Sequence, residues 1–337
     1  MPRSLRTALF QCYSSEYADE NIHFESAKLF INLPKPGVDH LCSWNGYVWH
    51  HHGDALGYRN PESPAQADVV LLGDSMTYGH GVEETSTAAH FLREELDRTV
   101  VNLGWTGDSP IQYLARLRNY ALPLHPRVVI VFFFENDLDD ILLDRTPDEI
   151  RKFVATGEAR EATVHPRAEL SVEYRPRSPF IGAAIGEHLL SLRALRFVAT
   201  RRPGPDDAPS PEDFVVVPPL DEEVPLQRGE HLAIDYLDAA TSMMARSARD
   251  AGTHIVFTTI PALDTGRLLQ LLRQRVHVAA RAAGVPFFDL VGKFAVDGRV
   301  QREFFLPYDG HLNEAGHRRV ARAVAEFIRE TKLLDAP

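Results

Sequence analysis

The sequence contains few cysteines and no excess of positive charge. Its 337 residues include 2 cysteines, Cys12 and Cys42, which can form at most one disulfide and lack the spacing of a zinc site. We interpret both as free thiols of a protein in a reducing compartment. Asp and Glu outnumber Lys and Arg by 47 to 36, and the resulting net charge of -11 argues against a nucleic acid or an anionic membrane as partner.

Long apolar runs are also missing. No stretch approaches the roughly 18–20 apolar residues that a membrane-spanning helix requires. The stretch from Met1 to Cys12 is only briefly apolar, and a secretory signal needs about 7–15 consecutive apolar residues. We therefore expect a cytoplasmic protein without a membrane span. A secreted form whose leader has been removed is the alternative, and the oligomeric state is left open.

Five short runs rich in β-branched and apolar residues alternate with helical patterns. The strands that these runs predict are 68–73, 99–104, 127–134, 253–260 and 285–290. The predicted helices are Thr85–Leu96, Ser109–Leu122, Ile234–Ala251, Thr265–Ala283 and Glu314–Thr331, with Thr85 and Ser109 as N-caps. Nearly continuous apolar strands are typical of a parallel sheet covered on both faces. The alternation predicts a three-layer α/β/α sandwich around a parallel five-stranded sheet.

Residues 1–66 fall outside this pattern. Their periodicity is weak, and the segment Trp44–His52 is rich in aromatic residues and histidine. We expect an extension that packs on the sandwich, whose own residues would be 67–142 and 232–333.

An insertion at 143–231 would separate the two halves of the sandwich. Its last part, Arg201–Glu230, is crowded with proline and acidic residues, which predicts a loop. Before it, apolar residues recur at near-helical spacing, namely Ile181, Ile185, Leu189, Leu192 and Leu195. This stripe predicts either a cap helix that rests on the core or a lid that faces the substrate.

Polar residues follow three of the predicted strands at their carboxyl ends, where ligands bind in parallel α/β sheets. Asp74 and Ser75 follow the first strand, Gly104 ends the second, and Asn136 and Asp137 follow the third. A serine in a turn before a helix exposes its hydroxyl. Two backbone N–H groups and a side-chain amide at these places could donate hydrogen bonds to an oxyanion. Each motif alone is also typical of an ordinary turn.

A fourth motif, Asp309-Gly310-His311, stands directly before the last predicted helix. A serine hydroxyl is a weak nucleophile until an imidazole takes its proton, and a carboxylate must fix the tautomer of that imidazole. Asp309 and His311 supply this pair within three residues. An Asp/Gly turn beside a surface histidine is the alternative, but four such motifs at successive strand ends favour a catalytic site.

The four motifs resemble the sequence blocks of the SGNH (GDSL-like) hydrolase family. They read GDSMTYG, NLGWTG, END and DGHLNEAGH in this order, and the resemblance runs from about Asp68 to Ile328 without the insertion. It implies the flavodoxin-like form of the sandwich. It also implies a serine esterase, or an acyltransferase that passes the acyl group to an alcohol or amine.

The resemblance assigns a role to each motif. It implies Ser75 as nucleophile, His311 as general base and Asp309 as the residue that orients the base. The oxyanion hole would be formed by the N–H of Ser75, the N–H of Gly104 and the side chain of Asn136, with Asp74 and Asp137 supporting the site. We expect no cofactor and no metal, and a small-molecule, carbohydrate or lipid ester as substrate.

Two positions depart from the family pattern. Phe134 stands where the third block usually has glycine, so the turn after the third strand could be shaped differently. The last block reads Asp-x-His rather than the frequent Asp-x-x-His, a shorter spacing that resembles polysaccharide O-acetyltransferases.

Several rival interpretations are weaker. An α/β-hydrolase would need glycine where Thr77 stands, and neither a P-loop nor a dinucleotide fingerprint is present. A magnesium-dependent phosphatase could use Asp137 and Asp139. A zinc site in His50–His52 is disfavoured because adjacent residues cannot all face one ion. A binding protein with a decayed site is disfavoured because the serine, asparagine and histidine are intact.

Overall fold

A computed structural model of the chain describes most residues outside the N-terminus and the insertion. The described residues are 22–44, 47–165, 169–170, 215–217, 219–220, 224–263, 266–295, 299–307 and 309–335. Cys12, the predicted stripe from Ile181 to Leu195 and most of the Pro-rich stretch lie outside them. Within the described residues no helix has the length and apolar character needed to cross a membrane.

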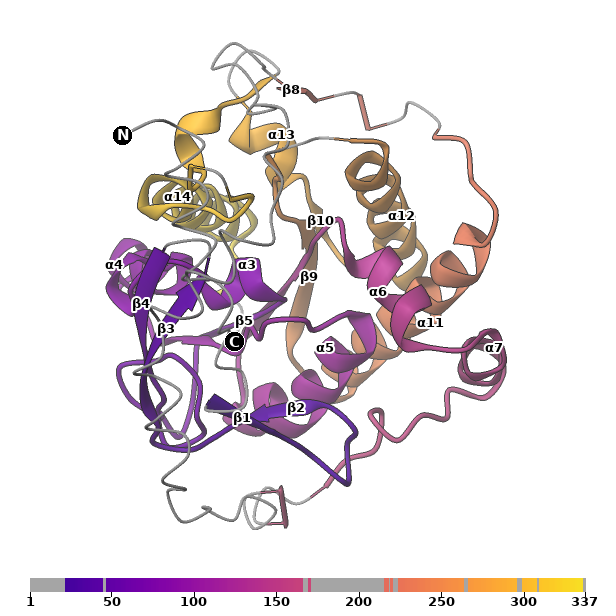
Figure 1. The fold of residues 1–337 in the computed structure, drawn as a ribbon, viewed down its shortest axis with the longest axis horizontal. Coiled ribbons are helices and arrows are strands. Elements are labelled where there is room, and N and C mark those ends of the chain that lie inside the picture. The colour runs from indigo at the N-terminus through magenta and orange to yellow at the C-terminus, as the bar shows by residue number, and fades with distance from the viewer. Residues whose placement is uncertain are drawn as a thin grey trace, which may run out of the picture.

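Five parallel strands form the central sheet (Figure 1). They are β5 (Val69–Leu72), β6 (Val100–Asn102), β7 (Val128–Phe133), β9 (His254–Thr259) and β10 (Phe287–Phe288). Their order across the sheet is β10-β9-β7-β5-β6, and every neighbouring pair is parallel. Renumbered along the chain this is the order 2-1-3-4-5, which is the flavodoxin-like arrangement. The five predicted strands are confirmed, and each observed strand lies inside its predicted range.

Side chains of the strands point alternately to two faces. In β5, Val70 and Leu72 join one buried apolar cluster, whereas Val69 and Leu71 join a second cluster on the other face. A strand that buries both faces needs helices on both sides, so the continuous apolar runs of the sequence have a direct structural cause. The predicted three-layer sandwich is confirmed.

Helices cover both faces of the sheet, as Figure 1 shows. The first face carries α5 (Pro110–Arg116), α11 (Glu230–Asp250) and α12 (Arg267–Ala283). The second face carries α4 (Ala88–Leu96), α13 (Leu290–Phe294) and α14 (Glu314–Thr331). Three small elements complete this side: β8 (Val215–Val216) pairs with β11 (Arg299–Val300), and the short helix η4 covers Arg302–Phe304.

Helix ends differ from the prediction in places. The N-cap of α4 is Thr87 rather than Thr85, because the Thr87 hydroxyl accepts the N–H of His90 at 3.3 Å. Residues Glu84–Ser86 before it form a separate short helix, η1. Ser109 is the N-cap of α5, as predicted, and its N–H donates to Gln112 at 3.1 Å. Beyond α5 the helical path widens into a π-helix in η2 (Leu117–Ala121) and then tightens into a 3-10 helix in η3 (Leu122–Leu124).

Two helices follow β7 that the sequence pattern did not predict. They are α6 (Asp137–Asp144) and α7 (Pro147–Thr156). The second lies in the predicted insertion and is packed on the sandwich, where the rings of Phe153 and Tyr236 of α11 are 4.6 Å apart. The first part of the insertion is therefore a helical layer beside α11.

Two hairpins precede the sandwich. They consist of β1 (His23–Glu25) with β2 (Asn32–Pro34), and of β3 (Asp39–Trp44) with β4 (Tyr47–His52). Their buried side chains join the first apolar cluster, together with Tyr58. Arg116 of α5 is fully buried and ties these parts together, donating to the Tyr58 hydroxyl at 2.7 Å and to the Asn32 carbonyl at 2.7 Å. A buried ion pair with Asp108 compensates its charge.

One buried histidine joins the second face to the start of α4. His317 of α14 is 1% exposed, and its Nδ1 accepts the N–H of Ala88 at 3.2 Å. Burial lowers the pKa of His317 to about 3, and the positive charges of Arg59 and His311 act in the same direction. The folded protein therefore holds this imidazole neutral.

Stability should consequently fall in mild acid. An unfolded histidine titrates near pH 6.5 and the folded His317 near pH 3, so its contribution is complete above pH 6.5 and is lost progressively as the pH falls toward 3. Between pH 7 and 5 the loss is on the order of 2 kcal/mol. His317→Gln, which keeps an acceptor for Ala88, should show a smaller loss in urea unfolding. His254→Gln at an exposed position should follow the wild type, and equal losses in all three proteins would contradict the prediction.

Candidate active site

Ser75 occupies the first position of α3 (Ser75–Tyr78), which begins directly after β5. Asp74 caps this helix, because its Oδ1 accepts the N–H of Met76 at 3.0 Å. Gly79 ends the helix at a φ of +83°, and its N–H donates to the Ser75 carbonyl at 3.1 Å. A helix of four residues has little stability of its own, so the rest of the protein must hold it in place.

Arg59 holds the C-terminal end of α3. Its guanidinium donates to the carbonyls of Tyr78 at 3.2 Å, Gly79 at 2.8 Å and Val82 at 2.6 Å. The side chain is buried and lies over the Tyr78 ring at 4.8 Å from its centre. A buried cation thus satisfies the carbonyls that a short helix leaves without partners.

Gly104 lets the loop after β6 approach α3 closely. A Cβ atom at this position would lie 2.6 Å from the Tyr78 nitrogen and 2.7 Å from the Thr77 carbonyl carbon. Any side chain would therefore push the loop away from the helix. The N–H of Gly104 donates to Asn102 Oδ1 at 2.9 Å, and Asn102 Nδ2 donates to the Thr77 carbonyl at 2.9 Å. The predicted oxyanion donor at Gly104 already has an acceptor inside the protein.

The structure brings together Ser75, His311 and Asp309. The Ser75 hydroxyl is 2.8 Å from His311 Nε2, and His311 Nδ1 is 2.5 Å from Asp309 Oδ1. With the carboxylate accepting from Nδ1–H, the neutral ring presents Nε2 to accept the serine proton. The Asp309 side chain is 2% exposed and the His311 side chain 20%, so the carboxylate is screened from water while the imidazole is accessible.

The short Asp-x-His spacing is accommodated by a tight turn. The backbone N–H of His311 donates to Asp309 Oδ1 at 2.8 Å, so one carboxylate oxygen accepts from both the backbone and the ring. The turn is closed by two further bonds, from Asp309 N–H to the Leu306 carbonyl at 3.1 Å and from Leu306 N–H to the His311 carbonyl at 2.8 Å. Asp309 therefore reaches the imidazole although the Asp-x-His spacing is one residue shorter than the frequent Asp-x-x-His spacing.

Asn136 lies half-buried in the turn after β7. Its Nδ2 donates to Asp140 Oδ2 at 2.6 Å, which uses one of its two amide hydrogens. Phe134 and Asp137 close the turn, because the Asp137 N–H donates to the Phe134 carbonyl at 2.9 Å and the Phe134 N–H donates to Asp137 Oδ2 at 3.1 Å. Phe134 does not have a positive φ, so this turn does not require the glycine that the family pattern usually has.

Two buried carboxyl groups support these turns. Burial raises the pKa of Asp74 to about 7, and the negative charges of Asp140 and Asp108 add to this effect. Burial also raises the pKa of Asp137 well above its usual range, and the charges of Asp74 and Asp140 act in the same direction. Asp137 also accepts the hydroxyl of Tyr113 at 2.7 Å. Both groups bind backbone or side-chain donors inside the protein.

The phosphatase interpretation is not supported. Asp137 is fully buried and Asp139 is exposed, as expected for residues two apart on α6, which do not share a face. In β4 the side chains alternate in the same way: His50 and His52 are exposed, and His51 is buried against Tyr78. Among the described residues no group of three His, Cys, Asp or Glu side chains could hold a metal ion.

Several residues of the site were missed by the sequence-based interpretation. They act on α3, on Asn136 or on the imidazole through tertiary contacts, and they are Arg59, His80, Asn102 and Asp140. Only Asn102 stands inside a quoted motif, where it could have been suspected as a link between the first and second blocks.

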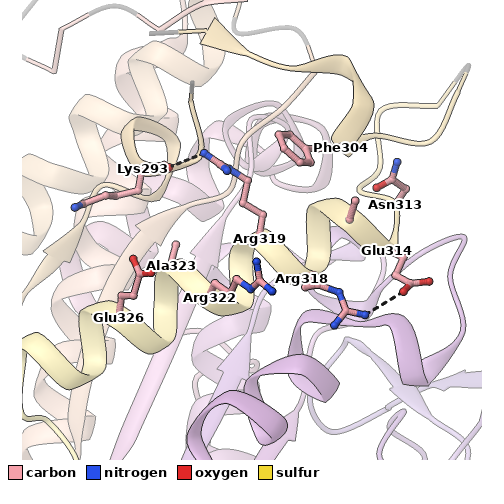
Figure 2. Close-up of a pocket in the computed structure, with 10 residues that line it drawn as sticks. Lys293, Phe304, Asn313, Glu314, Arg318, Arg319, Arg322, Ala323 and Glu326 are labelled. Atoms are coloured by element: carbon pink, nitrogen blue, oxygen red, sulfur yellow. Dashed lines mark hydrogen bonds and ion pairs between the residues drawn. The ribbon is translucent and has the colours of Figure 1, made fainter. Parts of the chain in front are cut away.

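A groove of about 790 Å³ lies along α14, but it is separate from this site (Figure 2). Its charged lining consists of Lys293, Glu314, Arg318, Arg319, Arg322 and Glu326, and no residue of the Ser75–His311–Asp309 set lines it. Figure 2 shows Arg318 directed toward Glu314 and Arg319 directed toward Lys293. Arg318 donates to the Glu314 carboxylate at 3.1 Å, and Arg319 donates to the Phe294 carbonyl at 2.9 Å and to the Lys293 carbonyl at 3.4 Å. The arginines are held by partners within the protein.

Comparison with known families agrees with this geometry. The family described as "GDSL-like Lipase/Acylhydrolase family" matches residues 71–319, a range that contains Ser75, Asn136, Asp309 and His311. The chain belongs to this family. The match covers most of the sandwich and includes the insertion, so the SGNH resemblance of the sequence motifs is confirmed.

Solved structures of a GDSL-like lipase, an acetylxylan esterase and a lipase/acylhydrolase are similar to the chain at low identity. A GDSL-like lipase from Bacteroides thetaiotaomicron is 14% identical, with 78% of this chain and 88% of that chain covered and a TM-score of 0.42. A catalytic mutant of an acetylxylan esterase from Geobacillus stearothermophilus is 13% identical, with 80% and 95% covered and a TM-score of 0.43. A lipase/acylhydrolase from Enterococcus faecalis is 16% identical, with 78% and 95% covered and a TM-score of 0.42. No curated protein sequence matches the chain.

Proposed function

We propose that this GDSL-like protein hydrolyses carboxylic esters through an acyl-enzyme on Ser75. The observation that carries the proposal is the unbroken chain of hydrogen bonds from Ser75 Oγ through the His311 ring to Asp309, with contacts of 2.8 and 2.5 Å. This chain joins a nucleophile, a base and a residue that fixes the base, which is the arrangement that activates an alcohol for acyl transfer.

The proposed reaction has two steps. His311 Nε2 takes the proton of Ser75 as the serine oxygen bonds to the ester carbonyl carbon, and the imidazolium then gives this proton to the departing alkoxide. Water enters next, and its oxygen bonds to the acyl carbon while one of its protons passes to the same nitrogen. The bond between the acyl carbon and Ser75 Oγ then breaks, and the imidazolium gives its proton to Ser75 Oγ as the acid leaves. Asp309 stays ionised throughout and stabilises the imidazolium that forms in each step.

The negative charge that develops on the ester carbonyl oxygen must be stabilised by hydrogen-bond donors close to Ser75. We propose the N–H of Ser75 and the side-chain amide of Asn136, which keeps one hydrogen after binding Asp140. The N–H of Gly104 would have to leave Asn102 to serve as the third donor.

Acyl transfer is the second candidate activity. An acyltransferase uses the same acyl-enzyme, and an alcohol or amine attacks it in place of water. The Asp-x-His spacing, which resembles polysaccharide O-acetyltransferases, keeps this candidate open. The two activities differ in product, either a free acid or a new ester or amide, and product analysis with an added sugar separates them.

The proposal predicts measurable hydrolysis of a short ester such as p-nitrophenyl acetate. Ser75→Ala should lower kcat/KM by about 10⁴-fold or more, because the nucleophile is lost while the rest of the site stays intact. Ser86→Ala is the matched control, since Ser86 lies on η1 and bonds Glu314 rather than His311. A Ser75→Ala protein that hydrolyses the ester as fast as the control would refute the assignment.

Removing the donor at Asn136 should slow the reaction without abolishing it. Asn136→Ala should lower kcat by about 10²–10³, the effect expected for one lost oxyanion donor. Asn136→Asp keeps the shape of the side chain but presents a carboxylate in place of the amide, so it should be impaired at least as much. Steady-state kinetics with the same ester checks both variants. Wild-type kcat in a folded Asn136→Asp protein would show that this turn is only structural.

A further inference from the structure

A second histidine lies directly on the proposed base. His80 follows the nucleophile helix, and its ring stacks on that of His311 with 4.4 Å between the ring centres and an angle of 21° between the planes. The His80 side chain is buried, with 4% of its surface exposed. One face of the catalytic imidazole is therefore covered by another imidazole rather than by water.

The hairpin of β3 and β4 holds His80 in this position. The ring of Trp49 lies 4.5 Å from that of His80, and the ring of Trp44 meets it edge-on at 5.7 Å. Backbone contacts fix the turn as well, because the His80 N–H donates to the Ser75 carbonyl at 3.1 Å and Arg59 binds the Gly79 carbonyl at 2.8 Å. The aromatic and His-rich stretch of the sequence thus reaches the active site through His80.

The same hairpin contacts the loop that carries the base. The hydroxyl of Tyr47 donates to the Pro307 carbonyl. A Cβ atom on Gly81 would lie 2.4 Å from Leu306 Cδ1, so the turn after His80 is packed tightly against this loop. His80 and His311 are consequently set against each other by three segments: the nucleophile turn, the hairpin and the loop before α14.

We propose that His80 is a positioning residue for the catalytic base, and that its ring keeps the His311 imidazole in the plane that joins Ser75 to Asp309. This inference rests on the proposed function. The two hydrogen bonds of His311 lie in the plane of its ring and at opposite nitrogens. They resist sliding of the ring, but they resist tilting about the line between the nitrogens only weakly. A ring stacked on one face blocks that tilt.

The His80 ring must be uncharged to position His311 in this way. His311 becomes positively charged when it takes the serine proton, and the π face of an uncharged ring attracts a cation, whereas a second imidazolium would repel it. Burial lowers the pKa of His80 well below its usual value, and the charges of His311 and Arg59 act in the same direction, against the opposing charge of Asp309. The charged or titratable groups that face the pair are Arg59, Asp74, Asp309 and His317.

Two substitutions of similar bulk test the stack. His80→Phe keeps a flat ring without its nitrogens, and His80→Leu fills the space without a flat ring. We expect kcat for a short ester to stay within about threefold of wild type in His80→Phe and to fall by about 10- to 100-fold in His80→Leu, because small misplacement of a catalytic group has effects of this size. KM should change little in either variant, since His80 acts through the base rather than on the substrate.

The results that overturn the proposal are distinct. A Leu variant as fast as the wild type would show that His80 only fills space, and Phe and Leu variants that are equally slow would show that the nitrogens matter instead of the stack. If the variants do not fold, NMR of the wild-type protein decides: the His80 ring signals should not titrate between pH 5 and 8, and titration there would refute the neutral stack. Failure of the proposed function appears separately, as an unaltered rate in Ser75→Ala.

Discussion

A helix of four residues carries Ser75, the proposed nucleophile, and the geometry of the candidate site depends on how that helix is fixed. So short a helix is not stable by itself, because the unfavourable free energy of forming the first turn is not offset by the hydrogen bonds of further turns. It is held at its start by the Asp74 cap, at its end by Arg59, and along its side by a loop that comes close only because residue 104 is glycine. These contacts fix the position of Ser75 at the carboxyl edge of the sheet.

The N-terminal hairpins and the loop before α14 meet next to Ser75. Arg59, Trp49 and His80 bring the N-terminal hairpins to one side of the nucleophile, and the turn from Leu306 to His311 brings the start of α14 to the other. Arg116 anchors the hairpins to α5 and to the loop beyond Gly107. The extension is therefore part of the active-site scaffold as well as a cover for the first face of the sheet.

Much of the fold follows from local sequence patterns. Strands such as Val128–Phe133 are buried on both faces, so they appear in the sequence as continuous apolar runs, and α14 has the same bounds as its predicted helix. The helix α6 was missed because it has only 8 residues and opens with three aspartates in its first turn, so its apolar stripe of Leu138, Ile141 and Leu142 is too short to stand out in the sequence. Thr85 and Thr87 are both good caps locally, and only the contacts of α4 decide between them.

The candidate site was predictable where a residue's own chemistry defines its role. Ser75, Asp309 and His311 were expected from motif and spacing, and the structure places them in hydrogen-bond contact. His80 could not be found in that way, because its role depends on a ring from another segment. At Gly104 the motif suggested a donor, whereas the structure shows a close approach to α3 and an N–H bound to Asn102.

The central claim is that His311 activates Ser75 for covalent acyl transfer, and intact-mass analysis after reaction with a fluorophosphonate tests it most directly. The wild-type protein should gain a single adduct, and peptide mapping should place it on Ser75. His311→Gln should react far more slowly, since the serine would lose its base while keeping its position. Labelling that is absent from the folded wild-type protein, or that persists equally in Ser75→Ala, would contradict the account.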